Sequence, residues 1–354
     1  MTAISRRLPP EWAPQSGVML TWPHAHSDWR PYLDVVEPTF AEIAAAVAAH
    51  EAVIISCFDA AHRDHVTNVL RKAGASLERV QLYEAASNDT WSRDHGPITV
   101  LEGAAPRLLD FTFNGWGNKF SADLDNLLSA ELHRQGAFGN CPMESIDLVL
   151  EGGGIEVDGE GTLLTTRSCL LAPTRNPHLD QAQIEAHLRR EFGVARVLWL
   201  AHGHVVGDDT DGHIDTLARF CDARTIAHVS CTTDDEAHWH ALQAMAQELA
   251  AFRTASGTPY RLVPLPLPAP IHDEEGKRLP ATYANFLIIN DAVLVPTYRD
   301  PADAVAIERL GQCFPDRRIV PIDCVPLIHQ YGSLHCVTMQ LPAGVLDRAV
   351  NAGV

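Results

Sequence analysis

One order of predicted elements recurs along this chain and constrains its fold more than any other feature. Two strands, a helix and a third strand follow one another four times, in units that begin near residues 97, 152, 213 and 283. The strands are short runs rich in β-branched and aromatic residues, and the helices carry apolar residues at helical spacing. Repeats of this kind are typical of closed architectures, in which each unit buries its apolar face against its neighbours.

A fifth unit forms if two segments from opposite ends of the sequence pair. The last predicted strand, residues 336–341, can lie beside an early strand over residues 18–22, which closes the units into a ring. We therefore predict an α/β fold, a five-bladed propeller of ββαβ modules with pseudo-fivefold symmetry, in which residues 1–354 form a single domain. A doubly wound sheet is the alternative. It is disfavoured because hairpins imply antiparallel neighbours and because no glycine-rich turn joins a strand to a helix.

The spacing of apolar residues also predicts which helix faces are buried. An alanine-rich helix is expected to bury Phe40, Ile43 and Val47. Ser121 is expected to cap the N-terminus of a later helix. Its inward residues are predicted to be Leu124, Leu127, Leu128 and Leu132. The proline-rich segment 264–270 is expected to be a loop and not a linker between domains.

Charge and cysteine content exclude several classes of protein. The formal net charge of −18 argues against nucleic acid as a partner and favours a cationic ligand, or solubility alone. No apolar run approaches the roughly 20 residues of a membrane span, and residues 1–10 lack the apolar stretch of a secretory signal. The eight cysteines form no CxxC pair, which predicts a reducing, cytoplasmic setting. A homodimer is one alternative, because the sequence does not determine the oligomeric state.

Conspicuous polar residues stand where the units begin. They are Asp94, Glu151, His213, Asp215, Asn285 and Cys336. In a ring of modules with the same orientation, equivalent positions meet near the axis. These side chains are therefore expected to converge on one pocket.

The stretch TDGHID, residues 210–215, is the densest of these groups. Read as a strand, it places Asp211, His213 and Asp215 on one face, because strand side chains alternate. Two carboxylates beside an imidazole need a positive partner when they are buried. That partner is either a metal ion or a cationic substrate.

Seven motifs spread over nearly the whole chain carry a resemblance to a known family. They are TWPHAHSDW (21–29), NDTWSRDHGP (88–97), FNGWGNKF (113–120), LEGGGIEVDGEGTLLTT (150–166), GDDTDGHID (207–215), ANFLIIN (284–290) and GSLHCVTMQLP (332–342). Together they resemble the agmatine deiminase family of the guanidine-modifying pentein superfamily. The resemblance implies a five-bladed α/β propeller. It also implies hydrolysis of agmatine to N-carbamoylputrescine and ammonia, a step of putrescine and polyamine biosynthesis, with no cofactor and no metal.

The resemblance further implies roles for individual residues. Cys336 aligns with the family's nucleophile, and His213 with Glu151 forms its acid–base pair. Asp94 and Asp215 fall on the carboxylates that bind the guanidinium group. Further candidates for substrate binding are Trp91, Asp209, Trp116 and Asn114. One departure is Ser333, where many members have a second glycine before the His-Cys pair, and other branches of the family act on peptidyl-arginine.

The chemistry of a guanidinium group fits these residue types. The group is planar and offers a fork of N–H donors that two carboxylates can clamp, within reach of a sulfur atom. A thiolate attacks the central carbon and forms a covalent thiouronium adduct. An imidazole then protonates the departing ammonia and deprotonates the incoming water, while a carboxylate holds the ring in orientation.

Three other functions fit parts of the pattern. A metal-dependent hydrolase is suggested by His202 and His204 with the stretch 208–213, but the further spaced histidines of such sites are missing. A guanidine-binding protein without activity would not need the full set of catalytic side chains. An amidinotransferase would pass the covalent intermediate to an amine instead of water. The histidines His202, His204 and His335 are otherwise expected to be structural, and the cysteines other than Cys336 inert.

Overall fold

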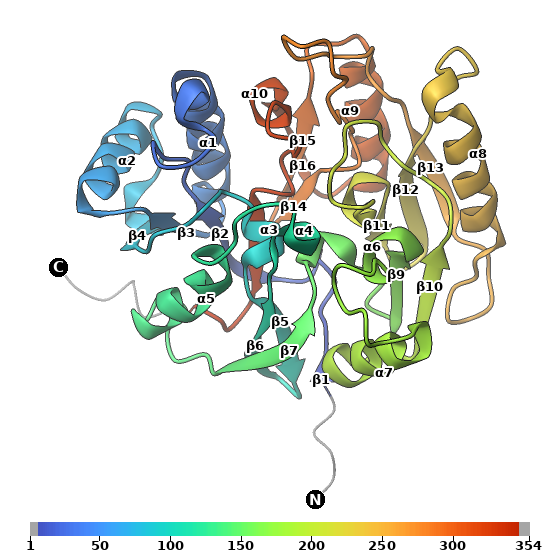
Figure 1. The fold of residues 1–354 in the computed structure, drawn as a ribbon, viewed down its shortest axis with the longest axis horizontal. Coiled ribbons are helices and arrows are strands. Elements are labelled where there is room, and N and C mark those ends of the chain that lie inside the picture. The colour runs from blue at the N-terminus through green and yellow to red at the C-terminus, as the bar shows by residue number, and fades with distance from the viewer. Residues whose placement is uncertain (1–5, 347–354) are drawn as a thin grey trace, which may run out of the picture.

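Five small sheets surround a common axis, with helices on the outside (Figure 1). A computed structural model describes residues 6–346 of the 354-residue chain. In this part of the chain, three sheets have three strands and two sheets have four. The predicted five-bladed propeller, the pentein fold, is confirmed.

Four consecutive units have the predicted order, with two antiparallel strands, a helix and a strand parallel to the second. The first unit is β5 (Ile98–Glu102), β6 (Ala105–Thr112), α5 (Asp125–Arg134) and β7 (Met143–Val149). The second is β8 (Glu156–Val157), β9 (Thr162–Thr166), α7 (Gln181–Phe192) and β10 (Arg196–Leu200). The third is β11 (Ala218–Asp222), β12 (Thr225–Val229), α8 (Glu236–Ala251) and β13 (Arg261–Leu265). The fourth is β14 (Leu287–Ile289), β15 (Ala292–Thr297), α9 (Ala302–Cys313) and β16 (Arg318–Asp323).

The fifth unit combines the two ends of the chain, as the sequence predicts. Its elements are β17 (Thr338–Pro342), β2 (Gln15–Thr21), α1 (Leu33–Ala48) and β3 (Ala52–Cys57). β17 runs antiparallel to β2 with Thr338 opposite Leu20, and β3 runs parallel to β2. Two further strands extend sheets at their edges, β4 (Val80–Glu84) and β1 (Arg6–Arg7), and the helix α2 (Ala60–Lys72) connects β3 to β4.

The outer helices bury the predicted apolar stripes, with one exception. In α1 the buried residues include Phe40, Ile43 and Val47. The helix α5 begins at Asp125 and not directly after Ser121, and Leu127 is 61 % exposed. The buried stripe of α5 is Asp125, Leu128, Ser129 and Leu132. The prediction for Leu127 was wrong because the helix starts later, so its inward face follows the spacing 0, 3, 4, 7 from Asp125.

Short helical turns that the sequence did not predict stand near the axis. They are α3 (Ser92–His95), α4 (Gly115–Asn118), η3 (Gly152–Gly154), α6 (Arg167–Leu170) and η4 (Ile214–Thr216). Three others lie elsewhere: η1 (Arg30–Tyr32), η2 (Leu77–Arg79) and α10 (Val325–Ile328).

The prediction of a strand over residues 210–215 was wrong. Asp211 has a φ of 68°, in a turn that precedes η4. The carboxylate of Asp208 accepts hydrogen bonds from the backbone N–H groups of Thr210 and Gly212, at 3.3 and 2.8 Å. These local bonds fold the segment back on itself, which an extended strand would not allow.

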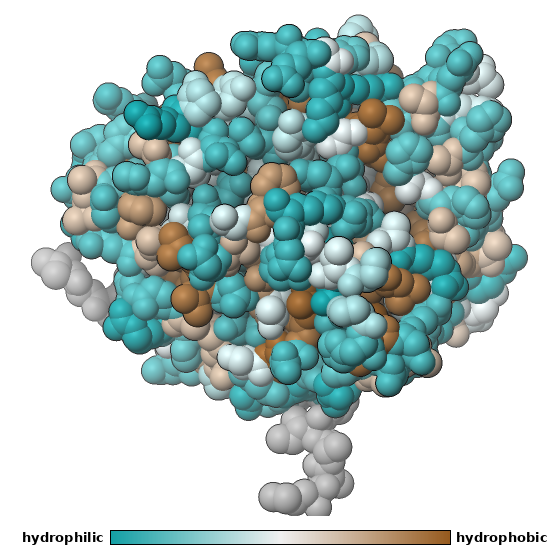
Figure 2. All heavy atoms as spheres, in the orientation of Figure 1, coloured by the Kyte–Doolittle hydropathy of each residue, from teal (hydrophilic) through white to brown (hydrophobic). Residues whose placement is uncertain are grey.

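Hydrophilic residues cover most of the face seen in Figure 2, with hydrophobic residues scattered among them. Within residues 6–346, no helix combines the length and the apolar character needed to cross a membrane. Of the predicted loop 264–270, residues 266–270 are a loop, whereas Pro264 and Leu265 belong to β13, so the prediction was wrong for these two residues.

Candidate active site

The polar residues at the unit starts meet in the interior of the ring. They come from all five units, and none is more than 5 % exposed: Asp94, Glu151, His213, Asp215, Asn285 and Cys336. Burial of so many ionisable groups in one place is costly without compensating charges or hydrogen bonds. The hydrogen bonds and charged neighbours of each side chain therefore indicate its role in the site.

Cys336 stands in the turn that leads into β17. Its Sγ donates a hydrogen bond to Asn285 Oδ1 at 3.4 Å and lies 4.0 Å from Asp215 Oδ2. Burial, together with the negative charges of Asp215 and Asp94, raises the pKa of the Cys336 thiol well above its usual value. Without a cation beside it, Cys336 is therefore a thiol and not a thiolate.

Asp94 is held from two sides. Its Oδ2 accepts a hydrogen bond from Trp116 Nε1 at 2.9 Å, and its Oδ1 accepts one from the Gly153 backbone N–H at 3.1 Å. The ring of His213 lies 3.6 Å from Oδ1. Burial raises the pKa of Asp94 to about 6, although His213 acts in the opposite direction.

Asp215 lies on η4 and has one satisfied and one unsatisfied oxygen. Oδ2 lies 2.7 Å from His335 Nδ1, whereas Oδ1 is buried without a hydrogen-bond partner among the described residues. Burial acts to raise the pKa of Asp215, but the contact with His335 outweighs it and the pKa is lowered. A Cβ atom on Gly153 would lie 2.5 Å from His213 Nδ1 and 3.2 Å from Asp215 Oδ2. Glycine is therefore required at this position, because these side chains approach its backbone too closely to leave room for a Cβ atom.

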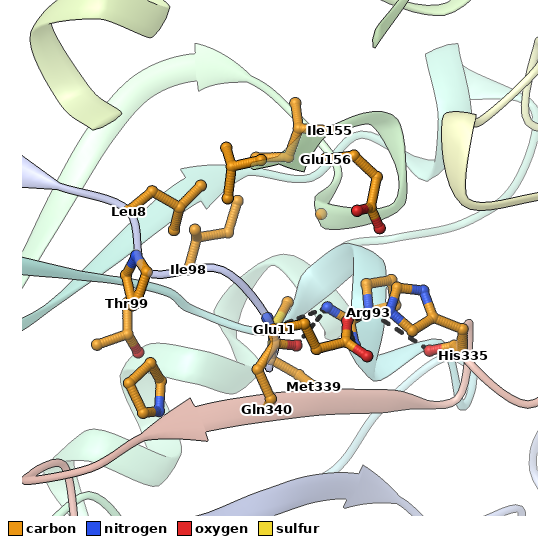
Figure 3. A pocket seen from close by; sticks show the side chains of 14 residues that line it. Leu8, Glu11, Arg93, Ile98, Thr99, Ile155, Glu156, His335, Met339 and Gln340 are labelled. Carbon is orange, nitrogen blue, oxygen red and sulfur yellow. Dashed lines mark hydrogen bonds and ion pairs between the residues drawn. The ribbon is translucent and has the colours of Figure 1, made fainter. Parts of the chain in front are cut away.

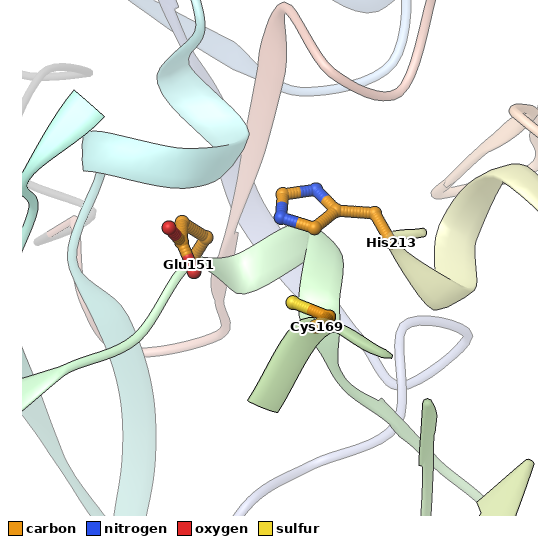
Figure 4. Close-up of side chains that lie close together, drawn as sticks. All are labelled: Glu151, Cys169 and His213. Carbon is orange, nitrogen blue, oxygen red and sulfur yellow. The ribbon is translucent and has the colours of Figure 1, made fainter. Parts of the chain in front are cut away.

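His213 is fully buried, and neither ring nitrogen has a hydrogen-bond partner among residues 6–346. Burial disfavours a charged ring, but the neighbouring acidic groups of Asp94, Cys169 and Glu151 raise the pKa of His213 well above its usual value. The predicted partner Glu151 does lie near His213 (Figure 4). However, both carboxylate oxygens of Glu151 accept hydrogen bonds from Arg175 Nε, each at 2.9 Å.

Arg175 is a site residue that the sequence reasoning missed. Its other nitrogens bind Asp211 Oδ2 at 2.7 Å and the carbonyl oxygen of Thr210 at 2.8 Å. Asp211 also binds Lys119 Nζ at 2.7 Å, so its carboxylate does not share the site of Asp215. A buried Glu151 requires a cationic partner, which was the only available signal for Arg175. No spacing along the chain identifies which arginine supplies that charge.

A pocket opens beside Cys336. Its atom-free space, open solvent at the mouth included, is about 490 Å³. The predicted residues Trp91, Trp116 and Asp209 line it. The other lining residues are Asp28, Asp89, Asp94, Phe120, Asp208, Thr210, Thr216, Gln330, Tyr331 and Gly332. A Cβ on Gly332 would lie 2.2 Å from the ring of Trp91, so this tryptophan requires a glycine opposite it.

The structure places Asn114 outside the lining of this pocket. Its Oδ1 accepts a hydrogen bond from the backbone N–H of Gly117 at 2.8 Å, and its Nδ2 donates to the carbonyl oxygen of Thr174 at 3.0 Å. Asn114 therefore caps α4, where Trp116 has a left-handed φ of 55°. Its contribution to the site is to hold the turn that carries Trp116.

A second group of buried charges lies behind His335, against another cavity (Figure 3). We call it the axial network, and its members are Glu11, Arg93, Glu156, Arg219 and His335. His335 Nε2 and Arg219 Nη2 lie 2.7 and 2.8 Å from the same oxygen of Glu11. Arg219 Nε also binds Glu156, and Arg93 Nη2 lies 3.8 Å from Glu11. The side chain of Arg93 is thus turned away from the pocket.

Two histidines considered as metal ligands lie elsewhere. His202 is 55 % exposed and pairs with Glu248 at 3.1 Å, and the ring of His204 packs against that of His238. Within residues 6–346, two groups of at least three His, Cys or acidic ligand atoms occur, and neither contains these histidines. The groups are Glu151, Cys169 and His213, and Glu11, Glu156 and His335.

The ring of five ββαβ units and the cysteine, histidine and carboxylates at its axis define a protein of the pentein class. The sequence profile of the Porphyromonas-type peptidyl-arginine deiminase family matches residues 7–342, and the chain belongs to this family. The resemblance seen in the motifs is therefore confirmed.

Three relatives illustrate the similarity. A crystal structure of a Porphyromonas gingivalis protein, provisionally named an arginine deiminase, is 51 % identical with a TM-score of 0.90, covering 96 % of this chain and 99 % of that one. A substrate complex of a cysteine-to-serine variant of C. jejuni agmatine deiminase is 38 % identical with a TM-score of 0.88, covering 97 % of both. The agmatine deiminase of Ectopseudomonas mendocina is 34 % identical over 95 % of both chains. The protein is accordingly a hydrolase acting on carbon–nitrogen bonds of amidines.

Proposed function

We propose that this protein is an agmatine deiminase, which hydrolyses agmatine to N-carbamoylputrescine and ammonia. The observation that carries the proposal is the buried group of Asp94, Asp215 and Cys336 beside a pocket that Asp94 and Cys336 line, with the Cys336 sulfur 4.0 Å from Asp215 Oδ2. A guanidinium group bound beside these residues would give the unpaired Oδ1 of Asp215 a donor and would offset one of the two buried negative charges.

The bound cation also activates the nucleophile. Burial and the negative charges of Asp215 and Asp94 hold the Cys336 proton in place, and the positive charge of a guanidinium between these carboxylates opposes their effect. Cys336 then loses its proton to solvent, and the thiolate forms a bond to the central guanidinium carbon. His213, whose pKa is raised, carries the proton that the leaving amino group needs. Ammonia departs and a thiouronium adduct on Cys336 remains.

Hydrolysis of this adduct uses the same histidine. His213, now neutral, takes a proton from water as the hydroxide bonds to the adduct carbon. The carbon–sulfur bond breaks, the ureido product leaves, and its hydroxyl proton restores the thiol of Cys336. Arg175 holds Glu151 near the ring, so Glu151 supplies negative charge that stabilises the imidazolium.

The far end of the pocket favours an ammonium group. Five aspartates line the pocket, while no lysine or arginine is among its lining residues in the described part of the chain. Lys119 is tied to Asp211, and Lys277 lies over the ring of Tyr331. Agmatine ends in an ammonium, whereas arginine adds a carboxylate that would need a cation. The N-carbamoylputrescine formed would serve putrescine and polyamine biosynthesis.

Free or peptidyl arginine is the second candidate substrate. It is favoured by the name of the matched family and by that of the Porphyromonas gingivalis relative. The two thiols of the site, Cys169 and Cys336, form no disulfide, which supports a reducing, cytoplasmic setting. An amidinotransferase would share the first half of the mechanism and differ in the acceptor.

The test is release of the amine, measured side by side, as ammonia from agmatine, arginine and an arginine-containing peptide and as ammonia or dimethylamine from asymmetric dimethylarginine. We expect agmatine to exceed arginine by at least roughly a hundredfold in kcat/KM. Equal values for the two would reject agmatine as the preferred substrate. No ammonia or dimethylamine from any of the four would reject the deiminase. A product that changes when an acceptor amine is added would indicate amidino transfer instead.

A further inference from the structure

Cys169 is a buried thiol beside the active site to which the proposed reaction assigns no task. Its sulfur, a ring nitrogen of His213 and a carboxylate oxygen of Glu151 all lie within 4.8 Å of one another (Figure 4). Cys169 comes from α6, Glu151 directly precedes η3, and His213 directly precedes η4. None of the three has any exposed surface. The fold therefore brings three separate segments together at this one point.

The imidazole of His213 indicates that something binds here. Its two nitrogens are buried without a hydrogen-bond partner among the described residues. Nearly all buried polar atoms of native proteins are paired, so an unpaired ring requires an explanation. Nδ1 lies on the side of Asp94, where substrate chemistry is proposed. Figure 4 shows the other ring nitrogen turned toward Glu151 and Cys169. The proposed reaction does not place the substrate on this side of the ring.

The three donor types match one class of ligand. A thiolate, an imidazole nitrogen and a carboxylate oxygen are the ligands of Zn²⁺, at about 2.0–2.3 Å, commonly with a fourth position left open. Ligand atoms around a tetrahedral ion are then roughly 3.3–3.8 Å apart. Side-chain rotations that move the three ligand atoms by about 1 Å would therefore bring them to these distances. Mg²⁺ and Ca²⁺ are disfavoured because they take six or more oxygen ligands and avoid sulfur.

The surrounding charges are compatible with a divalent cation. Asp94 adds a further carboxylate 3.6 Å from the ring of His213. Arg175 opposes a cation, but its charge is shared with Asp211, and each oxygen of Glu151 keeps a lone pair beyond its hydrogen bond. Hydrogen bonds of this kind to a carboxylate ligand also fix its orientation.

We propose that Glu151, Cys169 and His213 form a binding site for a soft divalent cation such as Zn²⁺, and that this ion inhibits the enzyme by holding His213. On binding, Cys169 and His213 each release a proton to solvent and the three side chains donate electron pairs to the ion. No group is oxidised or reduced. Binding is independent of the proposed function, whereas the inhibition rests on it, because His213 is the proposed proton carrier.

Co²⁺ is a suitable probe, because a cobalt–thiolate bond has a charge-transfer absorption in the near ultraviolet. We expect wild type to bind one equivalent of Co²⁺ with this absorption, displaced by Zn²⁺. Cys336→Ser should keep the signal, since the nucleophile is not a ligand. Cys57→Ala, which removes another fully buried thiol, should also keep it. Cys169→Ala and the isosteric Cys169→Ser should both lose it.

Inhibition is measured in parallel as ammonia release at increasing free Zn²⁺. Wild type and Cys57→Ala should be inhibited alike and recover with a chelator, while Cys169→Ala should require at least 30-fold more Zn²⁺. The site is disproved if wild type binds no Co²⁺, if Cys169→Ala keeps the absorption, or if Cys336→Ser loses it. If the melting temperature shows that Cys169→Ala folds poorly, the cobalt absorption of Cys169→Ser tests the site instead, and its loss is the expected result. Absence of any deiminase activity would count against the proposed function alone, because the cobalt signal does not need turnover.

Discussion

The two oxygens of the Asp215 carboxylate face very different surroundings. Oδ2 contacts His335, the first member of a network in which each charged group has an oppositely charged neighbour. Oδ1 is buried without a partner in the described part of the chain, as are both ring nitrogens of His213. Buried polar atoms are rarely left unpaired unless something else binds them. In the group around Asp94 the unpaired atoms belong to the residues proposed to contact the ligand, whereas in the axial network Arg93 Nη2 lacks a hydrogen bond but lies 3.8 Å from the opposite charge of Glu11.

The axial network also controls the protonation of its neighbour Asp215. Burial, with the nearby cations Arg219 and Arg93, lowers the pKa of His335. Yet both ring nitrogens of His335 lie 2.7 Å from carboxylate oxygens, one of Asp215 and one of Glu11. A neutral ring donates only one hydrogen bond. A second proton must therefore lie at one of these two contacts. The hydrogen bond between His335 and Asp215 holds the carboxylate of Asp215 in place on the side away from the pocket.

The largest effect is expected where the pocket side loses its nucleophile. Cys336→Ser should lower kcat by roughly 10⁴-fold or more, because a hydroxyl is far harder to ionise than a thiol. Circular dichroism and the melting temperature should be unchanged within experimental error. Cys57→Ser is the matched control and should retain activity. Ammonia release by a folded Cys336→Ser protein at more than a few per cent of wild type would contradict the covalent mechanism.

The clamp carboxylates come next in size. Asp94→Asn and Asp215→Asn should each lower kcat/KM by roughly 10²–10³-fold, or about 2.7–4 kcal/mol, because each leaves the guanidinium under-neutralised in a dry site. Steady-state kinetics with agmatine gives the value. A loss smaller than tenfold for either variant would remove that residue from the clamp.

The axial network should instead respond in stability. Glu11→Gln removes the carboxylate 2.8 Å from Arg219 and leaves Glu156 as its ion-pair partner, so it should lower the free energy of unfolding by about 3 kcal/mol, the lower end of the cost of breaking a buried ion pair. Urea denaturation gives this quantity. The control is Glu131→Gln, which breaks the exposed pair with Arg134 and should cost less than about 1 kcal/mol. Similar losses in the two variants would mean that Glu11 is not structurally special.

Sequence reasoning predicted the ring because its information is local and repeated. The strand, helix and hairpin signals recur in each unit, and one pairing, β17 with β2, completes them. It also predicted that Asp94, Asp215 and Cys336 would meet, because equivalent positions of a ring converge on its axis. These predictions did not depend on the conformation of the loops.

What the sequence could not predict lies in the loops. The stretch 210–215 alternates like a strand, but Asp208 binds the backbone of Gly212 and bends it into a turn. Arg175 and Cys169 reach Glu151 from the segment after β9, which carries no periodic signal. The charge of Glu151 predicted that a cation would be near, and only the structure identifies which one.

Asp94 should also set the acid limit of activity. Its pKa of about 6 means that the clamp loses its charge as pH falls, so kcat/KM should drop about tenfold per unit below pH 6. Stability has the opposite sign. The folded-state pKa lies above the unfolded value of about 3.9, so this group's contribution to stability is greatest at low pH and is lost as pH rises through 6. Asp94→Asn should therefore be more stable than wild type at pH 8, and the difference should vanish near pH 4. A flat pH–rate profile between pH 5 and 7 would contradict this assignment.

The smallest predicted effect concerns the far end of the pocket. Burial and the neighbouring charge of Asp208 raise the pKa of Asp209 to about 7, against the pull of Lys119 and Lys277. Asp208 itself is committed to the turn through Thr210 and Gly212. Asp209 is thus the pocket carboxylate best placed to change its charge when an ammonium group arrives.

Asp209→Asn should raise KM for agmatine about five- to tenfold and leave kcat nearly unchanged, because the ammonium is remote from the reacting carbon. Butylguanidine, which has the same guanidinium and a neutral tail, is the matched substrate and should show no change. In wild type, KM for agmatine should fall as pH rises from 6 to 8, since Asp209 ionises over this range. The variant should lose that dependence. If both substrates lose affinity equally, Asp209 acts on the shape of the pocket and does not bind the ammonium, and the preference for agmatine must come from another of the lining aspartates.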